Sequence, residues 1–126
     1  MGYEATSMSD ITKATGLTKG AIYGNFENKE HLAIEAFNYN IRKVVFLVAD
    51  KMNLETKAED KLLAMTAFYK SYYSFTMELG GCPLLNVGVD TNNFNSKLHS
   101  RVVLVLKKLQ KNVSVIIQQG IDEGAF

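Results

Sequence analysis

Residues 7–16 contain a short helical pattern with clear signals at both ends, and this feature constrains the fold more than any other. Ser7 is a good helix N-cap, and Asp10, three residues later, can complete a shortened capping box. Gly16 is the residue type that tolerates a left-handed backbone at a helix end. The pattern therefore predicts a helix that begins after Ser7, stops at Gly16, and carries Met8 and Ile11 on one face.

A second short helix is predicted directly after this glycine. Thr18 can serve as its N-cap, and Ile22 and Phe26 lie four residues apart, on what we expect to be its buried side. Leu17 is expected to pack between the two helices. Two short helices joined by so tight a turn are typical of a helix-turn-helix, whose second helix enters the major groove of DNA.

The residues around this pattern resemble a known family. The run G-L-T-K-G-A-I-Y-G-N-F-E-N-K-E-H-L, with the preceding G-Y-E-A-T-S-M-S-D-I, is similar to the DNA-binding domain of TetR-type transcriptional regulators. Residues 80–85 and 119–126 resemble connections that the family has further along its chain. Thr12 and Thr15 depart from the family, which usually has alanine there, so we expect looser packing or local hydroxyl hydrogen bonds at these positions.

The resemblance also implies what lies beyond the two ends. Family members begin with a helix before the Gly2–Tyr3 pair and end with two further helices that build a dimer interface. We therefore expect these 126 residues to be part of a longer chain, and we expect the full-length form to be a homodimer.

By the same resemblance, ten residues are implied in DNA binding. They comprise phosphate contacts, groove-facing residues and hydroxyls that help to hold the backbone. These are, in that order, Tyr23 and Lys29; Lys19, Gly20, Ala21, Gly24 and Asn25; and Thr6, Ser7 and Thr18. Since glycine and alanine offer no hydrogen-bonding side chain, direct base readout falls to Lys19, which suits guanine, and Asn25, which suits adenine.

Composition alone does not predict DNA binding. The formal net charge is +1, and residues 1–43 hold five basic and five acidic residues, without the basic excess typical of nucleic-acid binders. The lone cysteine, Cys82, cannot form an internal disulfide and fits a reducing cytoplasm. The TetR resemblance implies that this location is the bacterial cytoplasm. No apolar run is long enough to span a membrane.

The sequence holds none of the patterns that would indicate an enzyme or a metal site. It has no nucleophile elbow, glycine-rich phosphate loop or HExxH pattern. His31 and His99 have no metal-ligand spacing around them. We therefore predict no catalytic activity, no metal and no cofactor.

The rest of the chain is predicted to be helical, which makes the fold class all-α. The expected elements are a helix from Lys29 to Met52 capped by Asn28, a loop at 53–57, a helix at 58–79, a short helix from Pro83, a loop at 92–96 whose Asn95 or Ser96 caps the next helix, and a last helix at 97–120. The last of these is apolar almost all round, so it needs more partner surface than these residues supply. We predict a DNA-binding domain at 1–44 and an effector-binding domain at 45–126.

An aromatic stripe on the 58–79 helix supports two interpretations. Such a stripe is more often core than binding site, yet several tyrosines whose hydroxyls need partners also suit a small-molecule pocket. On the second interpretation, an apolar pocket is lined by Phe68, Tyr72, Phe75, Leu85, Phe94, Val105 and Leu109. Cys82 is interpreted as a small buried hydrophobe in preference to a sensor.

These observations predict an all-α, TetR-like transcriptional regulator, a repressor that a small-molecule ligand releases from its double-stranded DNA operator. The alternative is a helical module that binds a small ligand or a protein without reading DNA. A salt titration separates them, because a DNA reader loses affinity steeply as salt rises.

Overall fold

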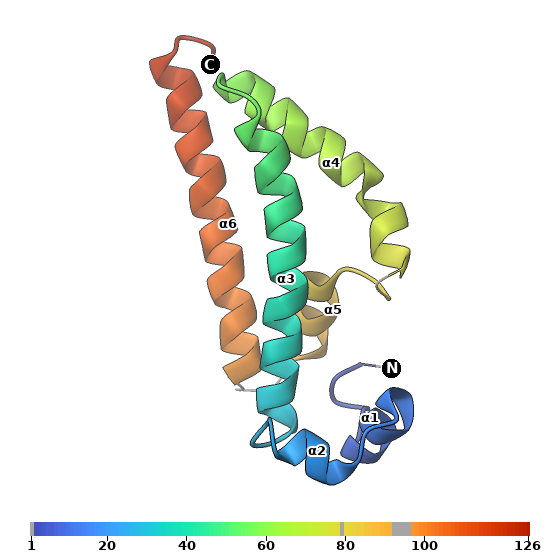
Figure 1. Cartoon of the computed structure of the whole chain (residues 1–126). Helices are drawn as coiled ribbons and strands as arrows, with labels where there is room; N and C mark the ends of the chain where they lie inside the picture. Colours follow the sequence, from blue (N-terminus) through green and yellow to red (C-terminus); the bar gives the residue numbers. More distant parts are fainter. Residues whose placement is uncertain (1, 79, 92–96) are drawn as a thin grey trace. The chain divides into compact units, whose positions relative to one another are not determined.

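The computed structural model describes residues 2–78, 80–91 and 97–126, and every element of regular structure within these ranges is an α-helix (Figure 1). The all-α prediction is confirmed. The helices are α1 (Met8–Thr15), α2 (Lys19–Tyr23), α3 (Lys29–Asn53), α4 (Ala58–Glu78), α5 (Pro83–Asp90) and α6 (Lys97–Asp122). The predicted loop at 92–96, with its proposed caps, and Leu79 at the end of the predicted fourth helix lie outside the described residues.

The chain forms two compact units, each built from two stretches of sequence. The first unit comprises Met1–Asn40 and Pro83–Val103, and the second comprises Ile41–Cys82 and Leu104–Phe126. Helices α3 and α6 contribute residues to both. The buried core of the first unit includes Ile22, Phe37, Leu98 and Val102.

Helix α1 begins and ends where its sequence predicts. The Ser7 hydroxyl accepts a hydrogen bond from the Asp10 N–H (3.1 Å), and the Asp10 carboxylate accepts one from the Ser7 N–H (2.8 Å), which completes the capping box. Gly16 ends the helix with φ = 70°, a left-handed conformation in which other residues are strained. The Thr12 and Thr15 hydroxyls donate to the carbonyls of Ser9 (2.7 Å) and Ile11 (2.8 Å).

Two expectations about the turn and α2 were wrong. Leu17 is 54% exposed, because α1 has no fully buried residue and offers no closed core for this side chain. Phe26 is half-buried but lies beyond α2, which ends after Tyr23: the N–H groups of Asn25 and Phe26 both donate to the Ile22 carbonyl and turn the chain. The Thr18 cap is confirmed, since its hydroxyl accepts the Ala21 N–H at 3.1 Å.

Helix α3 starts at the predicted cap and extends one residue beyond the predicted end. The Asn28 side-chain oxygen accepts the His31 N–H at 2.8 Å. Phe37, Val44 and Val48 are buried at helical spacing, whereas Val45 is 37% exposed. One residue turns the helix by 100°, so Val45 points away from the face that Val44 buries.

The second unit has its own core and a polar clamp at the start of α4. Val44, Val48 and Phe68 are buried together, with Met52, Met65, Tyr72 and Phe75 packed around them. After α6, the Glu123 carboxylate accepts the N–H of the fully buried Ala58 at 3.1 Å. The Gln119 side chain donates to the Thr56 carbonyl (2.9 Å) and accepts from the Lys61 ammonium (2.9 Å).

Apolar residues of α6 are divided between buried and exposed positions. Leu98, Val102, Val105 and Ile116 are buried. Another five keep 43–59% of their surface exposed: Leu104, Leu106, Val115, Ile117 and Ile121. The described residues therefore leave a broad apolar surface on this helix uncovered.

We predict that Ser7→Ala raises the pKa of Asp10 and destabilises α1. Hydrogen bonds from the Ser7 side chain and backbone hold the pKa of Asp10 below its ordinary value. A carboxyl with a lowered folded-state pKa stabilises fully above its unfolded pKa, about 4, and loses that contribution as pH falls through the folded pKa. Loss of the cap costs roughly 1 kcal/mol. An NMR titration of the Asp10 carboxyl tests this, with Ser9→Ala as the control, and an unchanged pKa in Ser7→Ala would contradict it.

Candidate nucleic-acid interface

Helix α2 is held by one buried residue and exposes the rest of its length. Ile22 is 3% exposed, and α2 contacts α1 (Figure 1). The residues implied in groove and phosphate contacts around it are all exposed: Lys19, Gly20, Ala21, Tyr23, Gly24 and Asn25. The structure therefore brings these six together on one short, outward-facing segment.

The groove-facing part of this segment carries few side chains. A Cβ atom added at Gly20 would meet nothing closer than the Thr18 hydroxyl at 4.0 Å, so the surface there is open. At Gly24 a Cβ atom would lie 3.1 Å from the Gly20 carbonyl oxygen, which is tighter than ordinary contact. The bare backbone lets a large, flat partner approach α2 closely.

The two candidate base readers differ in how free their side chains are. The Asn25 side-chain amide donates to the Ala21 carbonyl at 2.8 Å. A bidentate contact to adenine uses one N–H of that amide and its oxygen, so the second N–H can keep the bond to the helix. The Lys19 side chain is exposed at the first position of α2.

The three hydroxyls implied in backbone contacts are all engaged within the protein. The Thr6 hydroxyl donates to the Gly2 carbonyl at 2.7 Å, and the Ser7 hydroxyl donates to the Asp10 carboxylate at 2.7 Å. Thr18, in contrast, accepts the Ala21 N–H through its oxygen. Its hydroxyl proton therefore stays available for a phosphate oxygen.

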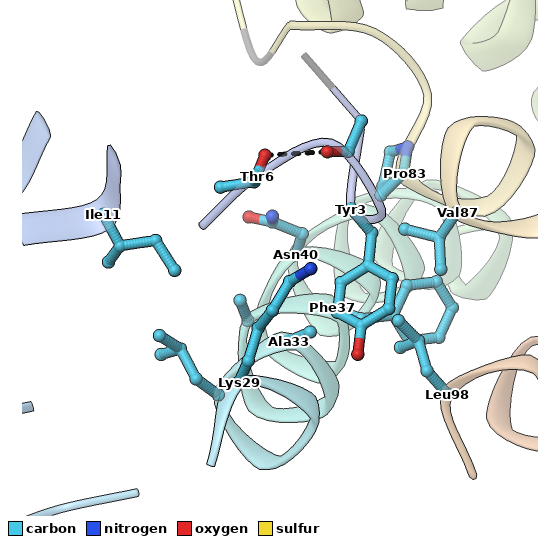
Figure 2. A pocket seen from close by; sticks show the side chains of 13 residues that line it. Tyr3, Thr6, Ile11, Lys29, Ala33, Phe37, Asn40, Pro83, Val87 and Leu98 are labelled. Atoms are coloured by element: carbon cyan, nitrogen blue, oxygen red, sulfur yellow. Dashed lines mark hydrogen bonds between the residues drawn. The ribbon is translucent and has the colours of Figure 1, made fainter. Parts of the chain in front are cut away.

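Lys29 lies beside Tyr3, a residue outside the set implied in DNA binding. Its ammonium nitrogen is 4.3 Å from the centre of the Tyr3 ring, in cation–π geometry (Figure 2). Burial raises the pKa of the Tyr3 hydroxyl, and the charges of Glu30 and Glu4 raise it further. The Gly2–Tyr3 pair marked the family in the sequence, but no local pattern connects Tyr3 with a residue 26 positions later.

Tyr3 and Lys29 also border a pocket of about 380 Å³ in the first unit (Figure 2). Apolar side chains form most of its wall. Its polar groups come from Tyr3, Thr6, Lys29 and Asn40, and the apolar wall includes Ile11, Leu32, Phe37, Val87 and Leu98. The pocket therefore lies among the elements that hold α1 and the start of α3.

The residues predicted to line an effector pocket are only partly brought together. Phe68, Tyr72 and Phe75 share one cluster in the second unit, with the Phe68 and Tyr72 rings 5.7 Å apart and the Tyr72 and Phe75 rings 6.1 Å apart. Val105 is buried, and Leu109 lines a different pocket of about 240 Å³ with Val48, Met52 and Ile116. Leu85 belongs to the first unit and is 66% exposed, and Phe94 lies outside the described residues.

The Tyr72 hydroxyl already has a partner. It donates to the Cys82 sulfur at 3.6 Å, and burial together with this hydrogen bond raises the pKa of Tyr72 far above its ordinary value. Burial, with a smaller contribution from Cys82, also raises the pKa of Tyr69. The thiol therefore supplies the Tyr72 hydroxyl with the hydrogen-bond partner whose absence would have favoured a small-molecule pocket.

Two features are absent from the described part of the chain: a cluster of metal-ligating side chains and a helix able to span a membrane. Within residues 2–78, 80–91 and 97–126, no three His, Cys, Asp or Glu side chains gather where they could hold a metal ion. None of the helices in these ranges is both long and apolar enough to cross a membrane.

A short capped helix, a left-handed glycine turn and a second helix anchored by one buried residue define a helix-turn-helix protein. Two family models match this chain. Residues 1–36 match the bacterial regulatory proteins of the tetR family, and residues 58–126 match the tetracyclin repressor-like C-terminal domain. The chain belongs to the TetR family, whose members are transcriptional regulators.

Individual relatives agree with this assignment. The chain is 32% identical to the uncharacterized HTH-type transcriptional regulator YxaF of Bacillus subtilis (strain 168), and the match covers 99% of this chain and 64% of YxaF. A TetR-family regulator from Cytophaga hutchinsonii has a similar structure (TM-score 0.85, 36% identity), with 96% of this chain and 60% of that one covered. The fatty acid degradation regulator FadR from Bacillus halodurans is also similar (TM-score 0.78, 26% identity, 98% and 62% covered). The chain thus spans about 60–64% of the length of these relatives.

Proposed function

We propose that this protein is a sequence-specific DNA-binding transcriptional regulator, a repressor that acts in the cytoplasm on a double-stranded operator. The observation that carries the proposal is the exposed, nearly bare face of α2, flanked by the Thr18 hydroxyl and Tyr23. Membership of the TetR family supports it. The surface suits a helix that fits into the major groove, with phosphate contacts that set its register.

Specificity in this proposal comes from few direct contacts. Lys19 is the one charged side chain of α2, and the Asn25 amide, which donates to the Ala21 carbonyl at 2.8 Å, keeps a second N–H and its oxygen for a base. Ala21 can contact a thymine methyl group, and the shape of the DNA supplies the remainder. The alternative function is a helical ligand- or protein-binding module without DNA readout, which the even charge balance of residues 1–43 favours.

We predict that Lys19→Ala and Lys29→Ala have different effects on DNA binding. Lys29→Ala and Tyr23→Phe remove phosphate contacts and should weaken binding to operator and random duplexes about equally. Lys19→Ala should reduce the difference in binding free energy between operator and random duplexes by roughly 1–3 kcal/mol, because a bidentate base contact is lost. Fluorescence anisotropy of the full-length protein with labelled duplexes, titrated with salt, measures both effects.

Two results of this measurement would count against the proposal. If Lys19→Ala kept the full operator preference, Lys19 would not read a base. If the wild-type protein bound duplexes weakly and without a linear log–log salt dependence, the module without DNA readout would be the better description. Lys13→Ala, on the exposed last turn of α1, is the control for the loss of a positive charge.

We further propose that an apolar small molecule binds among the helices of the second unit and lowers DNA affinity. The proposed site centres on Phe68, Tyr72 and Phe75, and Val105 and Leu109 of the predicted set belong to the same unit. A ligand can shift DNA affinity only by its difference in affinity for the two states, which is usually worth about 1–3 kcal/mol, or 5- to 150-fold. The aromatic cluster supports the site because it is large, apolar and next to buried valines of α3.

We predict that Tyr72→Ala reduces ligand binding and leaves DNA affinity nearly unchanged. The fluorescent probe 1-anilinonaphthalene-8-sulfonate, whose aromatic rings bind apolar surfaces, is titrated into the full-length protein to measure the first effect. Anisotropy with the operator measures the second. Tyr73→Ala is the matched control, because Tyr73 is the next residue of α4 and is 72% exposed. Equal probe binding by wild type and Tyr72→Ala would show that this cluster is ordinary core.

We predict that the full-length protein is a two-fold dimer whose half-sites lie about one helical turn of DNA apart. Apolar residues of α6 that are 43–59% exposed support an association that covers them. Sedimentation at micromolar concentration, with and without the operator, measures the assembly. A monomer under both conditions would contradict the prediction.

A further inference from the structure

The carboxylate of Asp90, the last residue of α5, sits directly on the backbone that precedes α1. Its Oδ2 atom accepts a hydrogen bond from the Glu4 N–H at 2.9 Å, between residues 86 positions apart. A Cβ atom placed on Gly2 would lie 2.7–2.9 Å from the three atoms of this carboxyl group. The contact is therefore close on two sides, and a side chain at position 2 would displace this carboxyl group.

Asp90 places a negative charge at the C-terminal end of α5, where it requires compensation. The last turn of a helix carries partial negative charge, so an aspartate there is unfavourable unless a donor compensates it. The Glu4 N–H is such a donor, since a backbone N–H bound to a carboxylate is a charge-assisted hydrogen bond. The hydrogen bond from the Glu4 N–H therefore stabilises the charged form of Asp90 at this helix end.

Residues 2–6, here called the N-terminal strap, connect Asp90 to the candidate phosphate contacts. Thr6 donates from its hydroxyl to the Gly2 carbonyl (2.7 Å) and from its N–H to the Tyr3 carbonyl (3.2 Å), so the strap is a closed turn (Figure 2). The strap leads directly into Ser7, the cap of α1. Its Tyr3 ring packs against the Lys29 ammonium at the start of α3.

We infer that Asp90 is a positioning residue for DNA binding: its carboxylate holds the N-terminal strap, and the strap places Thr6, Ser7 and Lys29. The inference rests on the proposed DNA-binding function. Asp90 itself contacts no DNA in this mechanism. Because phosphate contacts carry no sequence information, loss of the Asp90 carboxylate changes affinity for all duplexes alike.

The inference predicts an effect opposite in sign to simple electrostatics. Removing an acidic residue raises the net charge, and long-range attraction to phosphates would then strengthen DNA binding. Loss of the contact acts in the other direction, because the strap is no longer held. We expect Asp90→Ala to bind operator and random duplexes about threefold to tenfold more weakly, as for a partly exposed hydrogen bond.

Four variants of the full-length protein test the inference by fluorescence anisotropy with labelled duplexes. Gly2→Ala should weaken binding as Asp90→Ala does, because its methyl group displaces the same carboxylate. The double variant should be no weaker than either single variant, since both changes remove one contact. Asp90→Asn should bind within about twofold of wild type, because its amide oxygen still accepts the Glu4 N–H.

Two further measurements complete the experiment. Val89→Ala is the matched control, because Val89 precedes Asp90 in α5 and is 76% exposed; it should bind like wild type. Hydrogen exchange of the Glu4 amide, followed by NMR without DNA, should be faster in Asp90→Ala than in wild type and unchanged in Val89→Ala.

The inference is overturned if Asp90→Ala binds DNA as tightly as wild type or more tightly, or if the losses from Gly2→Ala and Asp90→Ala add. If the wild-type protein binds no duplex, the proposed function fails. The hydrogen-exchange rate of the Glu4 amide then tests the contact between Asp90 and Glu4 by itself. In that case, faster exchange in Asp90→Ala supports the held strap, and equal exchange overturns it.

Discussion

Burial of the Ile22 side chain is the interaction on which the candidate interface depends. A helix as short as α2 is unstable by itself, because too few hydrogen bonds offset the cost of ordering its first turn. The Thr18 cap and the buried Ile22 hold it on the rest of the first unit. Every other residue of α2 can then face outward without loss of stability, which is what a recognition helix requires.

Contacts at the two ends of the helix-turn-helix complement this anchor. Before the helix-turn-helix, the strap and the capping box fix the start of α1. After it, Asn28 caps α3. Lys29 follows that cap directly and lies against Tyr3, so its charge is held near the interface although the segment has no basic excess. Placement of a few groups, more than total charge, is thus the basis of the proposed DNA affinity.

The second unit is organised around aromatic packing instead of charge. Phe68 is buried against Val44 and Val48 of α3. Tyr72 extends the cluster toward Cys82, and the Tyr72 hydroxyl donates a hydrogen bond to the Cys82 sulfur. Because the hydroxyl of Tyr72 is satisfied within the protein, a ligand at the proposed site would gain chiefly from apolar contact. The clamp formed by Gln119 and Glu123 fixes the start of the helix that carries this cluster.

The sequence by itself determined the elements whose causes are local. The caps at Ser7, Thr18 and Asn28 and the turn at Gly16 involve residues at most four positions apart, so residue type and spacing were enough to predict them. The family also followed from a contiguous run of residues. The effector pocket, the boundary at residue 44 and the roles of the DNA-facing residues stay predictions. Only the tertiary structure decided that Leu17 is exposed, that Phe26 lies beyond α2, that Tyr3 meets Lys29 and that Asp90 holds Glu4. Except for the local turn that ends α2, each of these depends on which surfaces meet after the chain has folded. The last joins residues 86 positions apart, a distance over which no sequence periodicity carries information.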